Sequence, residues 1–422
     1  MPSTAHNWAD NYTYRAATIH YPQTVEQLQD LVRHSPKLRA LGSRHSFNDI
    51  ADSPGDLVSI DQIAEDIVID RGRHTASIPA GMRYGQFALH LHREGYALPN
   101  LASLPHISVA GACATATHGS GVHNGSLSTA VLALELVTAD GELRTLSREK
   151  DGDQFAGAVV SLGGLGVITR LTLDLTPTFD VQQDVYENLP LAELEAHFDT
   201  ITASAYSVSF FTDWRDDKIN QVWLKHRVID QPSNAAPDLF GARRASANRH
   251  PLPGISAVNC TEQMGIPGPW YERLPHFRMD FTPSSGEELQ TEYLVPRQHA
   301  MQAIHAVNRL SATVSPLLQT SEIRLIAADD LWMSPFYKQA CIGLHFTWQK
   351  KWDAVKPVLP LIEAALDPFG ARPHWGKLFT MSASKVQSLY ERLPDFKNLL
   401  RAYDPQGKFH NAFLDKYIFG TD

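Results

Sequence analysis

The 422-residue chain has few cysteines and no long apolar segment. Its three cysteines, Cys113, Cys260 and Cys341, show no C-x-x-C spacing, so we expect neither a disulfide framework nor a structural zinc site. No stretch approaches the roughly 20 apolar residues that a membrane-spanning helix needs. The first ten residues also lack a basic region followed by an apolar run. These features favour a cytoplasmic protein without a membrane partner.

An excess of basic residues is also missing. The chain has 37 lysines and arginines against 46 acidic residues, a formal net charge of −9, which argues against a nucleic-acid partner. Apolar residues make up 43% and charged residues 20%, as is typical of a soluble globular protein. The length predicts two or three domains.

Several common catalytic motifs are absent. The sequence contains no H-E-x-x-H, G-x-S-x-G or Walker motif, which excludes the commonest zinc-protease, serine-hydrolase and P-loop interpretations. The pattern that starts at Gly119 has Asn124 where a dinucleotide motif has its third glycine, and no apolar strand precedes it. We therefore do not expect Rossmann-type nicotinamide binding.

Two loops of small residues stand out instead. Residues 38–48 form a short apolar strand that runs into Gly-Ser-Arg-His-Ser, and residues 110–125 are rich in Gly, Ala, Ser and Thr. Loops with few bulky side chains let backbone N–H groups approach phosphate oxygens, so two such loops predict one long anionic ligand such as a dinucleotide. His45, in the first loop, is a candidate to hold that ligand covalently. The alternative is a histidine that only bonds a local carbonyl.

The N-terminal part shows a compact α+β pattern. A helix opens at Thr24 and runs to Arg33, and a second helix at residues 84–94 ends at Gly95. Short strands are expected at residues 38–41, 57–60, 67–70, 75–78, 131–138 and 142–146.

After residue 175 the strands become longer. A hairpin at residues 208–214 and 221–227 and strands at 289–295, 322–327 and 341–348 alternate with helices at 296–311 and 352–366. This pattern predicts an antiparallel sheet with helices on one face. Residues 231–253 are expected to form an exposed loop that adds little core, and residues 384–403 a helix.

Two of these strands carry polar pairs. Because alternate residues of a strand point to the same side, Glu322 shares a face with Arg324, and His345 shares one with Thr347. Gly343, on the same face, is expected to leave space for a ligand. Such alternation usually marks the solvated side of a sheet. The composition of this set, to which Lys377 adds a cation, also suits a polyol-binding site.

At this point the sequence resembles the vanillyl-alcohol-oxidase type of FAD flavoproteins, and within it the sugar-alcohol oxidases and their aldonolactone-oxidase relatives. The resemblance rests on motifs along the whole chain: Asn7-Trp8-Ala9, Gly42 to Phe47, Ser103 to Gly111, Thr117 to Gly121, Gly164 to Val167, Glu322-Ile-Arg324, His345-Phe-Thr347, His374 to Lys377, Asp404-Pro and Gly407-Lys-Phe. The combination is specific, whereas each motif alone is weak. This chain has Arg44 where many members have glycine before the histidine.

The resemblance implies an α+β fold. Residues 1–175 would form the two-subdomain FAD-binding domain of the PCMH type. Residues 176–372 would form an α+β substrate (cap) domain with an antiparallel sheet, and residues 373–422 would return to the first domain. FAD would be attached covalently through His45. Residues implied in cofactor binding are Gly42, Ser43, Arg44, His45, Ser46, Phe47, Ser108, Gly111, Thr115, Thr117, His118, Gly119, Gly121, Gly166, Val167, His374 and Asn411.

The resemblance also places Ser108, Glu322, Arg324, His345, Thr347 and Lys377 around the substrate. The implied activity is oxidation of the terminal hydroxyl of a sugar alcohol such as xylitol or sorbitol, with O2 reduced to H2O2. His345 is the expected base, since a neutral imidazole titrates near physiological pH. Arg324 and Lys377 would stabilise developing negative charge, and Glu322 would orient hydroxyls together with Ser108 and Thr347.

Two alternatives remain open. One is an aldonolactone oxidase of the same architecture, which we rank lower because the Glu322, Arg324, His345 and Thr347 set matches the polyol oxidases. The other is a sugar-binding protein that uses the same polar face without a cofactor. In every case we expect a monomer without a metal ion.

Overall fold

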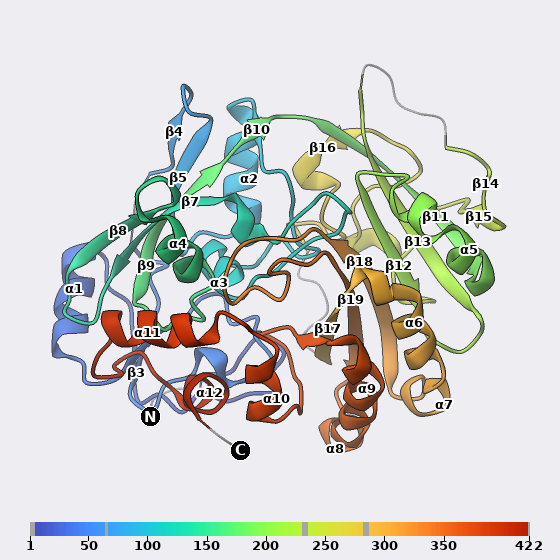
Figure 1. Ribbon diagram of the computed structural model, residues 1–422. Helices are drawn as coiled ribbons and strands as arrows, with labels where there is room; N and C mark the ends of the chain where they lie inside the picture. The colour runs from blue at the N-terminus through green and yellow to red at the C-terminus, as the bar shows by residue number, and fades with distance from the viewer. Residues whose placement is uncertain (1–4, 64–65, 230–234, 282–286, 421–422) are drawn as a thin grey trace.

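The computed structural model describes residues 5–63, 66–229, 235–281 and 287–420. The N-terminal part contains two sheets. The smaller is parallel, in the order β1 (Ile19–His20), β3 (Asp56–Val58) and β2 (Leu38–Ala40). The larger is antiparallel, in the order β4 (Val68–Asp70), β5 (Thr75–Pro79), β9 (Val167–Asp174), β7 (Val131–Val137) and β8 (Leu143–Ser147). Both appear at the left of Figure 1.

Helices pack on these sheets: α1 (Val25–His34), α2 (Tyr84–Arg93), α3 (Val109–Ala114) and α4 (Arg148–Val159). The expected start of the first helix is confirmed, because the Thr24 hydroxyl accepts a hydrogen bond from the Gln27 N–H at 3.3 Å. The expected stop after α2 is confirmed as well, since Gly95 has a φ of +85°. A short pair, β6 (Tyr96–Ala97) and β10 (Thr176–Pro177), closes this part.

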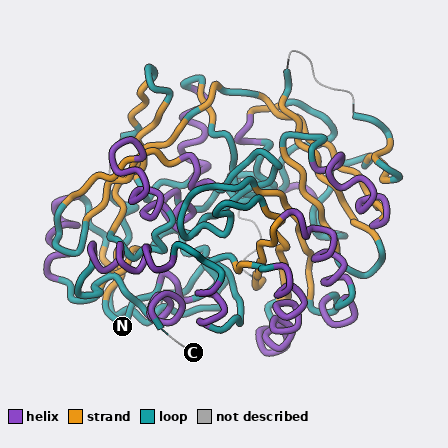
Figure 2. The backbone as a smooth tube through the Cα atoms, viewed as in Figure 1, coloured by secondary structure: helices purple, strands orange, loops and turns teal. Residues whose placement is uncertain are grey.

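A large antiparallel sheet dominates the second half, at the right of Figure 1. Its order is β14 (Asp238–Leu239), β15 (Ala242–Arg244), β11 (Asp180–Pro190), β13 (Lys218–Arg227), β12 (Ser207–Thr212), β18 (Leu318–Ile326), β19 (Cys341–Gln349), β17 (Glu288–Pro296) and β20 (Arg372–Pro373), with β16 (Gly268–Pro269) pairing β11. One face carries the helices α5 (Leu191–Thr202), α6 (Ala300–Asn308), α7 (Ser311–Val314), α8 (Trp352–Val355) and α9 (Leu359–Leu366). The opposite face turns toward the N-terminal part (Figures 1 and 2). The α+β fold with an antiparallel sheet is as predicted.

The C-terminal residues form α10 (Ala383–Ser388), α11 (Leu393–Tyr403), α12 (Ala412–Leu414) and a π-helical turn at Asp415–Phe419. Helix α11 contacts α4, and α12 contacts the 3-10 turn Asp49–Ala51 that follows the His45 loop. The end of the chain thus packs against its beginning.

Three expected helices are interrupted. Residues 384–403 divide into α10 and α11, and residues 352–366 divide into α8, a 3-10 turn at Lys356–Val358 and α9. Prolines lie at the starts of the later pieces, where a missing N–H costs nothing. Residues 296–311 likewise form a 3-10 turn, α6 and α7.

The expectation for residues 231–253 is wrong in one respect. Residues 231–234 lie outside the described residues, but the rest includes the short strands β14 and β15. Ala242 and Ala245 are buried, and residues 250–252 line the main cavity. The segment therefore contributes both core and cavity wall, because pairing of β15 with β11 draws it onto the sheet.

None of the described helices is both long enough and apolar enough to cross a membrane.

Candidate active site

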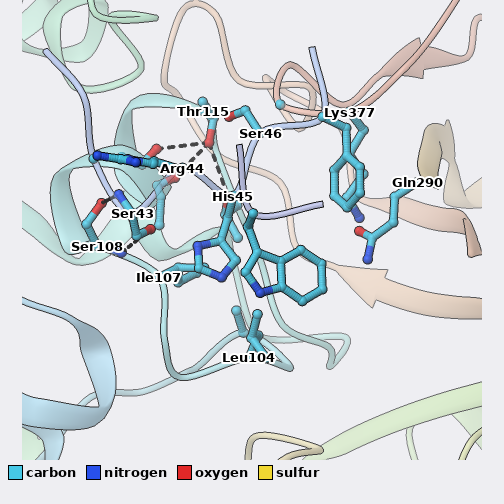
Figure 3. A pocket seen from close by; sticks show the side chains of 18 of the residues that line it. Ser43, Arg44, His45, Ser46, Leu104, Ile107, Ser108, Thr115, Gln290 and Lys377 are labelled. Carbon is cyan, nitrogen blue, oxygen red and sulfur yellow. Dashed lines mark hydrogen bonds between the residues drawn. The ribbon is translucent and has the colours of Figure 1, made fainter. Parts of the chain in front are cut away.

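A cavity of about 680 Å³ lies between the N-terminal part and the free face of the large sheet. Both small-residue loops line it, as does the polar face of β17, β18 and β19. Figure 3 shows His45 in the middle of this space, with Ser43, Arg44 and Ser108 on one side and Gln290 and Lys377 on the other. The cavity therefore joins the two sets of residues that the sequence singled out.

Ser108 ties the two loops together. The Ser43 N–H donates to the Ser108 hydroxyl at 3.3 Å, and the Ser108 N–H donates to the Ser43 hydroxyl at 3.0 Å. A side chain at Gly42 or Gly111 would clash, since a Cβ atom there would lie 2.6 or 2.8 Å from the Ser108 oxygen. The small residues thus permit a close approach of the two backbones, and they leave the cavity wall open to a ligand.

His45 is held by packing. Its ring stacks on Trp8, with centroids 5.3 Å apart and an interplanar angle of 19°. Nδ1 is buried and has no hydrogen-bond partner among the described residues, and burial lowers the pKa of this imidazole to about 4. His45 thus lines the cavity with a neutral ring, one nitrogen of which has no hydrogen-bond partner among the described residues.

The residue before His45 has a backbone conformation that favours glycine. Arg44 has a φ of +62°, in the left-handed region that glycine adopts without strain. Its carbonyl accepts a hydrogen bond from the Trp8 N–H at 2.8 Å, so the turn also helps to hold the ring that covers His45. The loop keeps the glycine-like conformation with an arginine in place.

Most of the expected cofactor residues line the cavity: Gly42, Ser43, Arg44, His45, Ser46, Phe47, Ser108, Gly111, Thr115, Thr117, His118, Gly166 and His374. Four do not: Gly119, Gly121, Val167 and Asn411. Direct contact of these four with a ligand in the cavity is therefore not supported.

Each of these four residues has a structural role instead. A Cβ at Gly119 would lie 2.2 Å from the Leu101 carbonyl, and the Gly121 N–H donates to the Leu325 carbonyl at 2.8 Å. Val167 begins β9 inside a small apolar cluster with α1. The Asn411 amide donates to three carbonyls, those of Asp49, Ile50 and Asp52, and so braces the segment after the His45 loop.

The two predicted polar pairs lie on one wall of the cavity. Glu322 pairs with His345 across β18 and β19, and His345 pairs with Glu292 on β17. The side chains of Glu322, Arg324, His345 and Thr347 all line the cavity, yet each residue is only 5–7% exposed. This face is therefore an enclosed polar surface and not the solvated side of a sheet.

Glu292 is the residue that the sequence analysis missed. It is 1% exposed, and its carboxylate lies 2.9 Å from Arg324 Nη2, 2.6 Å from Lys377 Nζ and 3.2 Å from His118 Nε2. Although burial opposes it, the positive charges of Arg324 and Lys377 hold the pKa of this carboxyl well below its usual range. Glu292 thus fixes both cations of the site.

Gly343 leaves room for this carboxylate and not for a ligand. A Cβ at Gly343 would lie 2.9 Å from Glu292 Oε1, and the residue does not line the cavity. The expectation that it leaves room for a ligand is wrong, because the neighbouring strand fills that room with a glutamate.

His345 is hydrogen-bonded at both ring nitrogens. Nδ1 lies 2.5 Å from Lys377 Nζ, and Nε2 lies 3.0 Å from the Thr347 hydroxyl. Burial, with Lys377 nearby, lowers the pKa of His345 to about 4. Burial also lowers the pKa of Lys377, whereas Glu292 opposes this shift. Both pKa values therefore lie below those of the free side chains, and the contact between Nδ1 and Nζ couples the protonation of the two groups.

One group of metal-ligand type occurs among the described residues: His118, Glu292 and His374. Both oxygens of this glutamate already bind cationic side chains, Arg324 and Lys377, whose positive charges would repel a metal ion. The arrangement does not support a metal site.

The comparisons with known proteins agree with this geometry. A model of an FAD-binding domain matches residues 16–147, and a model of D-arabinono-1,4-lactone oxidase matches residues 285–417. The alditol oxidase of a Streptomyces species is 50% identical over 424 residues, which cover all of both chains. This chain belongs to the FAD-dependent alditol oxidase family.

More distant members of the wider family are also similar. The L-gulono-1,4-lactone dehydrogenase of Mycobacterium tuberculosis is 26% identical and the L-gulonolactone oxidase of Mus musculus 22% identical, each over 98% of both chains. The crystal structure of cholesterol oxidase from B. sterolicum has a TM-score of 0.79 at 16% identity and covers 98% of this chain and 96% of its own. The likeness to cholesterol oxidase shows the fold, whereas the FAD-binding model and the 50% identical alditol oxidase show an FAD-dependent oxidoreductase.

Proposed function

We propose that the protein oxidises the terminal primary hydroxyl of a sugar alcohol such as xylitol or sorbitol to the aldose and reduces O2 to H2O2. The observation that carries the proposal is the full-length, 50% identity to an alditol oxidase. The enclosed set of Glu322, Arg324, His345, Thr347 and Lys377 supports it, since these side chains can together bind several hydroxyls.

The cavity residues fit FAD. The loops of small residues that line the cavity let the backbone approach a pyrophosphate, and the unpartnered Nδ1 of His45 suits a covalent bond to the flavin ring. When bound, FAD supplies the acceptor of the hydride that leaves the carbinol carbon and passes the electrons to O2. His374 and Thr117 complete the cavity wall nearby.

The proton acceptor in this proposal is the His345–Lys377 pair. An ammonium at Lys377 can only donate to Nδ1, which leaves the proton on Nε2 and no lone pair for the substrate. When Lys377 is a neutral amine, it can accept from Nδ1–H, and Nε2, which lies 3.0 Å from the Thr347 hydroxyl, has a lone pair that can accept a proton from the substrate. The hydroxyl proton then passes to Nε2 while the Nδ1 proton passes to Lys377.

Arg324 holds the substrate oxygen as its proton leaves. Its guanidinium lies against Glu292 and 3.7 Å from Glu322, where it keeps its charge despite burial. A fixed cation of this kind stabilises a developing alkoxide without reorganisation. Ser108, Glu322 and Thr347 would orient further hydroxyls along the cavity.

An aldonolactone oxidase remains the second candidate. The match of residues 285–417 to the D-arabinono-1,4-lactone oxidase model favours it. We rank it lower because the lactone-oxidising relatives that match over the full length are 22–26% identical, against 50% for the alditol oxidase.

The test is a substrate panel. Purified holoprotein is mixed with xylitol, sorbitol or gulonolactone in separate samples. H2O2 release is recorded in air, and bleaching of the flavin absorbance is recorded in a second set of samples without oxygen. We expect both signals with the polyols, and we expect kcat/KM to be higher for the polyols than for the lactone. A higher kcat/KM for the lactone would replace the proposal with the second candidate.

We also propose residues 1–175 as the FAD domain, 176–372 as the cap and 373–422 as the returning segment, in a cytoplasmic monomer. Contacts of α11 with α4 support the return. Sedimentation at micromolar concentration tests the monomer, and a dimer-sized particle would contradict it.

A further inference from the structure

A buried lysine lies behind the substrate wall. Lys225, on β13, is 1% exposed and does not line the cavity. Its ammonium group contacts three acceptors: the Leu274 carbonyl, the Pro275 carbonyl at 3.1 Å and Nδ1 of His276 at 3.2 Å. An ammonium has three N–H donors and no acceptor, so these three atoms satisfy it completely.

This arrangement decides where the proton of His276 sits. Burial, together with Lys225, lowers the pKa of His276 to about 4, so the imidazole is neutral and carries one proton. Burial lowers the pKa of Lys225 to about 7, and below that pH its ammonium donates to Nδ1. The carboxylate of Glu322 beside Nε2 can only accept, so the proton of the imidazole is on Nε2. Nε2 lies 2.8 Å from Oε1 of Glu322 and donates to it.

The ring of His276 has little freedom to move. It lies between Phe211, at 5.5 Å and an interplanar angle of 68°, and Trp223, at 5.0 Å and 76°. Its backbone N–H donates to the Ser103 carbonyl at 3.0 Å, in the N-terminal part of the chain. A donor fixed in this way holds one oxygen of Glu322 in place.

The other oxygen of Glu322 is available to a ligand. Oε2 lies 3.7 Å from Arg324 Nε, beyond hydrogen-bond distance, on a side chain that lines the cavity. Arg324 and His276 hold the pKa of Glu322 far below its usual range although burial opposes this. Glu322 is therefore an ionised acceptor with one oxygen anchored and one free.

We propose that Lys225 and His276 are positioning residues that fix the tautomer of the imidazole and thereby aim Glu322 at a substrate hydroxyl. This inference rests on the proposed function, because the hydroxyl belongs to the polyol. It assigns Lys225, which touches neither substrate nor cofactor, a role in the affinity for polyols. The relay runs from Lys225 Nζ through both nitrogens of His276 to Glu322.

The kinetic test uses two removals, one conservative replacement and one control. Lys225→Met removes the donor to Nδ1, and His276→Phe keeps the ring between its aromatic neighbours but removes both nitrogens. His276→Gln retains an amide donor near Glu322. Thr261→Val is the control, because the Thr261 hydroxyl donates to the same Pro275 carbonyl at 2.8 Å, and its contact with His276, at 3.4 Å, is to the backbone carbonyl and not to the imidazole.

We expect Lys225→Met and His276→Phe to raise KM for the polyol about 10- to 100-fold, the range for one hydrogen bond to a charged group, with kcat within a few-fold. His276→Gln should recover most of the affinity, and Thr261→Val should change KM less than twofold. If the control raises KM as much as Lys225→Met, or if kcat falls with KM unchanged, the inference is wrong.

A second readout does not need turnover. In holoprotein with ¹⁵N-labelled histidine at pH 6, the signal that disappears in His276→Phe reports the tautomer of this residue. The expected spectrum shows a protonated Nε2 and an unprotonated Nδ1; a protonated Nδ1 overturns the inference. Should the expected tautomer be found in a protein that oxidises no polyol, the proposed function fails while the Lys225–His276 geometry stands.

Discussion

Replacement of the buried carboxylate at the centre of the site gives the sharpest test of its electrostatics. Glu292→Gln keeps the shape of the side chain but removes the negative charge that lies 2.9 Å from Arg324 and 2.6 Å from Lys377. Removal of one partner from a buried ion pair costs about 3–5 kcal/mol, because the other charge is left without compensation. Two features reduce this cost here: Glu322 remains 3.7 Å from Arg324, and Lys377 can lose its proton.

We therefore expect a loss of about 3 kcal/mol in the free energy of unfolding, near the lower end of that range. At about 2–4 °C per kcal/mol for a cooperative unit of 150–250 residues, Tm should fall by about 6–12 °C. Thermal unfolding followed by circular dichroism and urea titration of the same holoprotein measure the two quantities.

A second buried glutamate supplies the matched control. The Glu363 carboxyl accepts hydrogen bonds from the Tyr293 hydroxyl at 3.0 Å and from the Thr380 N–H and hydroxyl, each at 2.6 Å. These donors are neutral, and burial raises the pKa of this carboxyl. Glu363→Gln should cost only about 1 kcal/mol. Equal losses in the two variants would refute the reasoning, since burial alone and not ion pairing would then set the cost.

Three further outcomes are expected. Lys377→Met should abolish the rise of kcat/KM with pH, which in the wild type should have a midpoint below 10.5 because burial lowers the pKa of the lysine; an unchanged pH profile would exclude the His345–Lys377 pair as the base. His45→Ala should release all FAD on acid precipitation, whereas the wild-type pellet should stay yellow; a colourless wild-type pellet would rule out the covalent bond. Burial lowers the pKa values of His276 and His345 to about 4, so the unfolded chain binds more protons below pH 6.5, and stability should fall from pH 6.5 to 4 by up to about 1.4 kcal/mol per pH unit for each histidine. A Tm that stays constant over that range would contradict this sign.

The sequence located the polar wall because strand alternation is a local property. Glu322 and Arg324 lie two residues apart, as do His345 and Thr347, so each pair was certain to share a face once the strands were recognised. That the two pairs share one cavity depends on the pairing of β18 with β19, which periodicity alone could not decide. The family resemblance placed both pairs around the substrate without giving this pairing.

Glu292 could have been found by the same reasoning. It stands in the expected strand 289–295 between Thr291 and Tyr293, and it shares a face with Gln290. A carboxylate in the middle of a buried strand needs a cationic partner, and this signal was present in the sequence. His276 and Lys225 gave no such signal, because their partners lie 46 and 51 residues away in irregular or distant segments.

The charges around His345 also bear on which ligands the site can bind. When Lys377 is protonated, its charge and that of Arg324 balance the charges of Glu292 and Glu322. Beside these four side chains a charged ligand group would lack a compensating partner, and Glu288 adds a further carboxyl to the same cavity wall, so the site favours neutral polyols over sugar acids. When Lys377 is neutral, the same group of side chains carries one net negative charge. The hydroxyl proton of the substrate then restores neutrality, so the electrostatics that select an uncharged alcohol also favour its deprotonation.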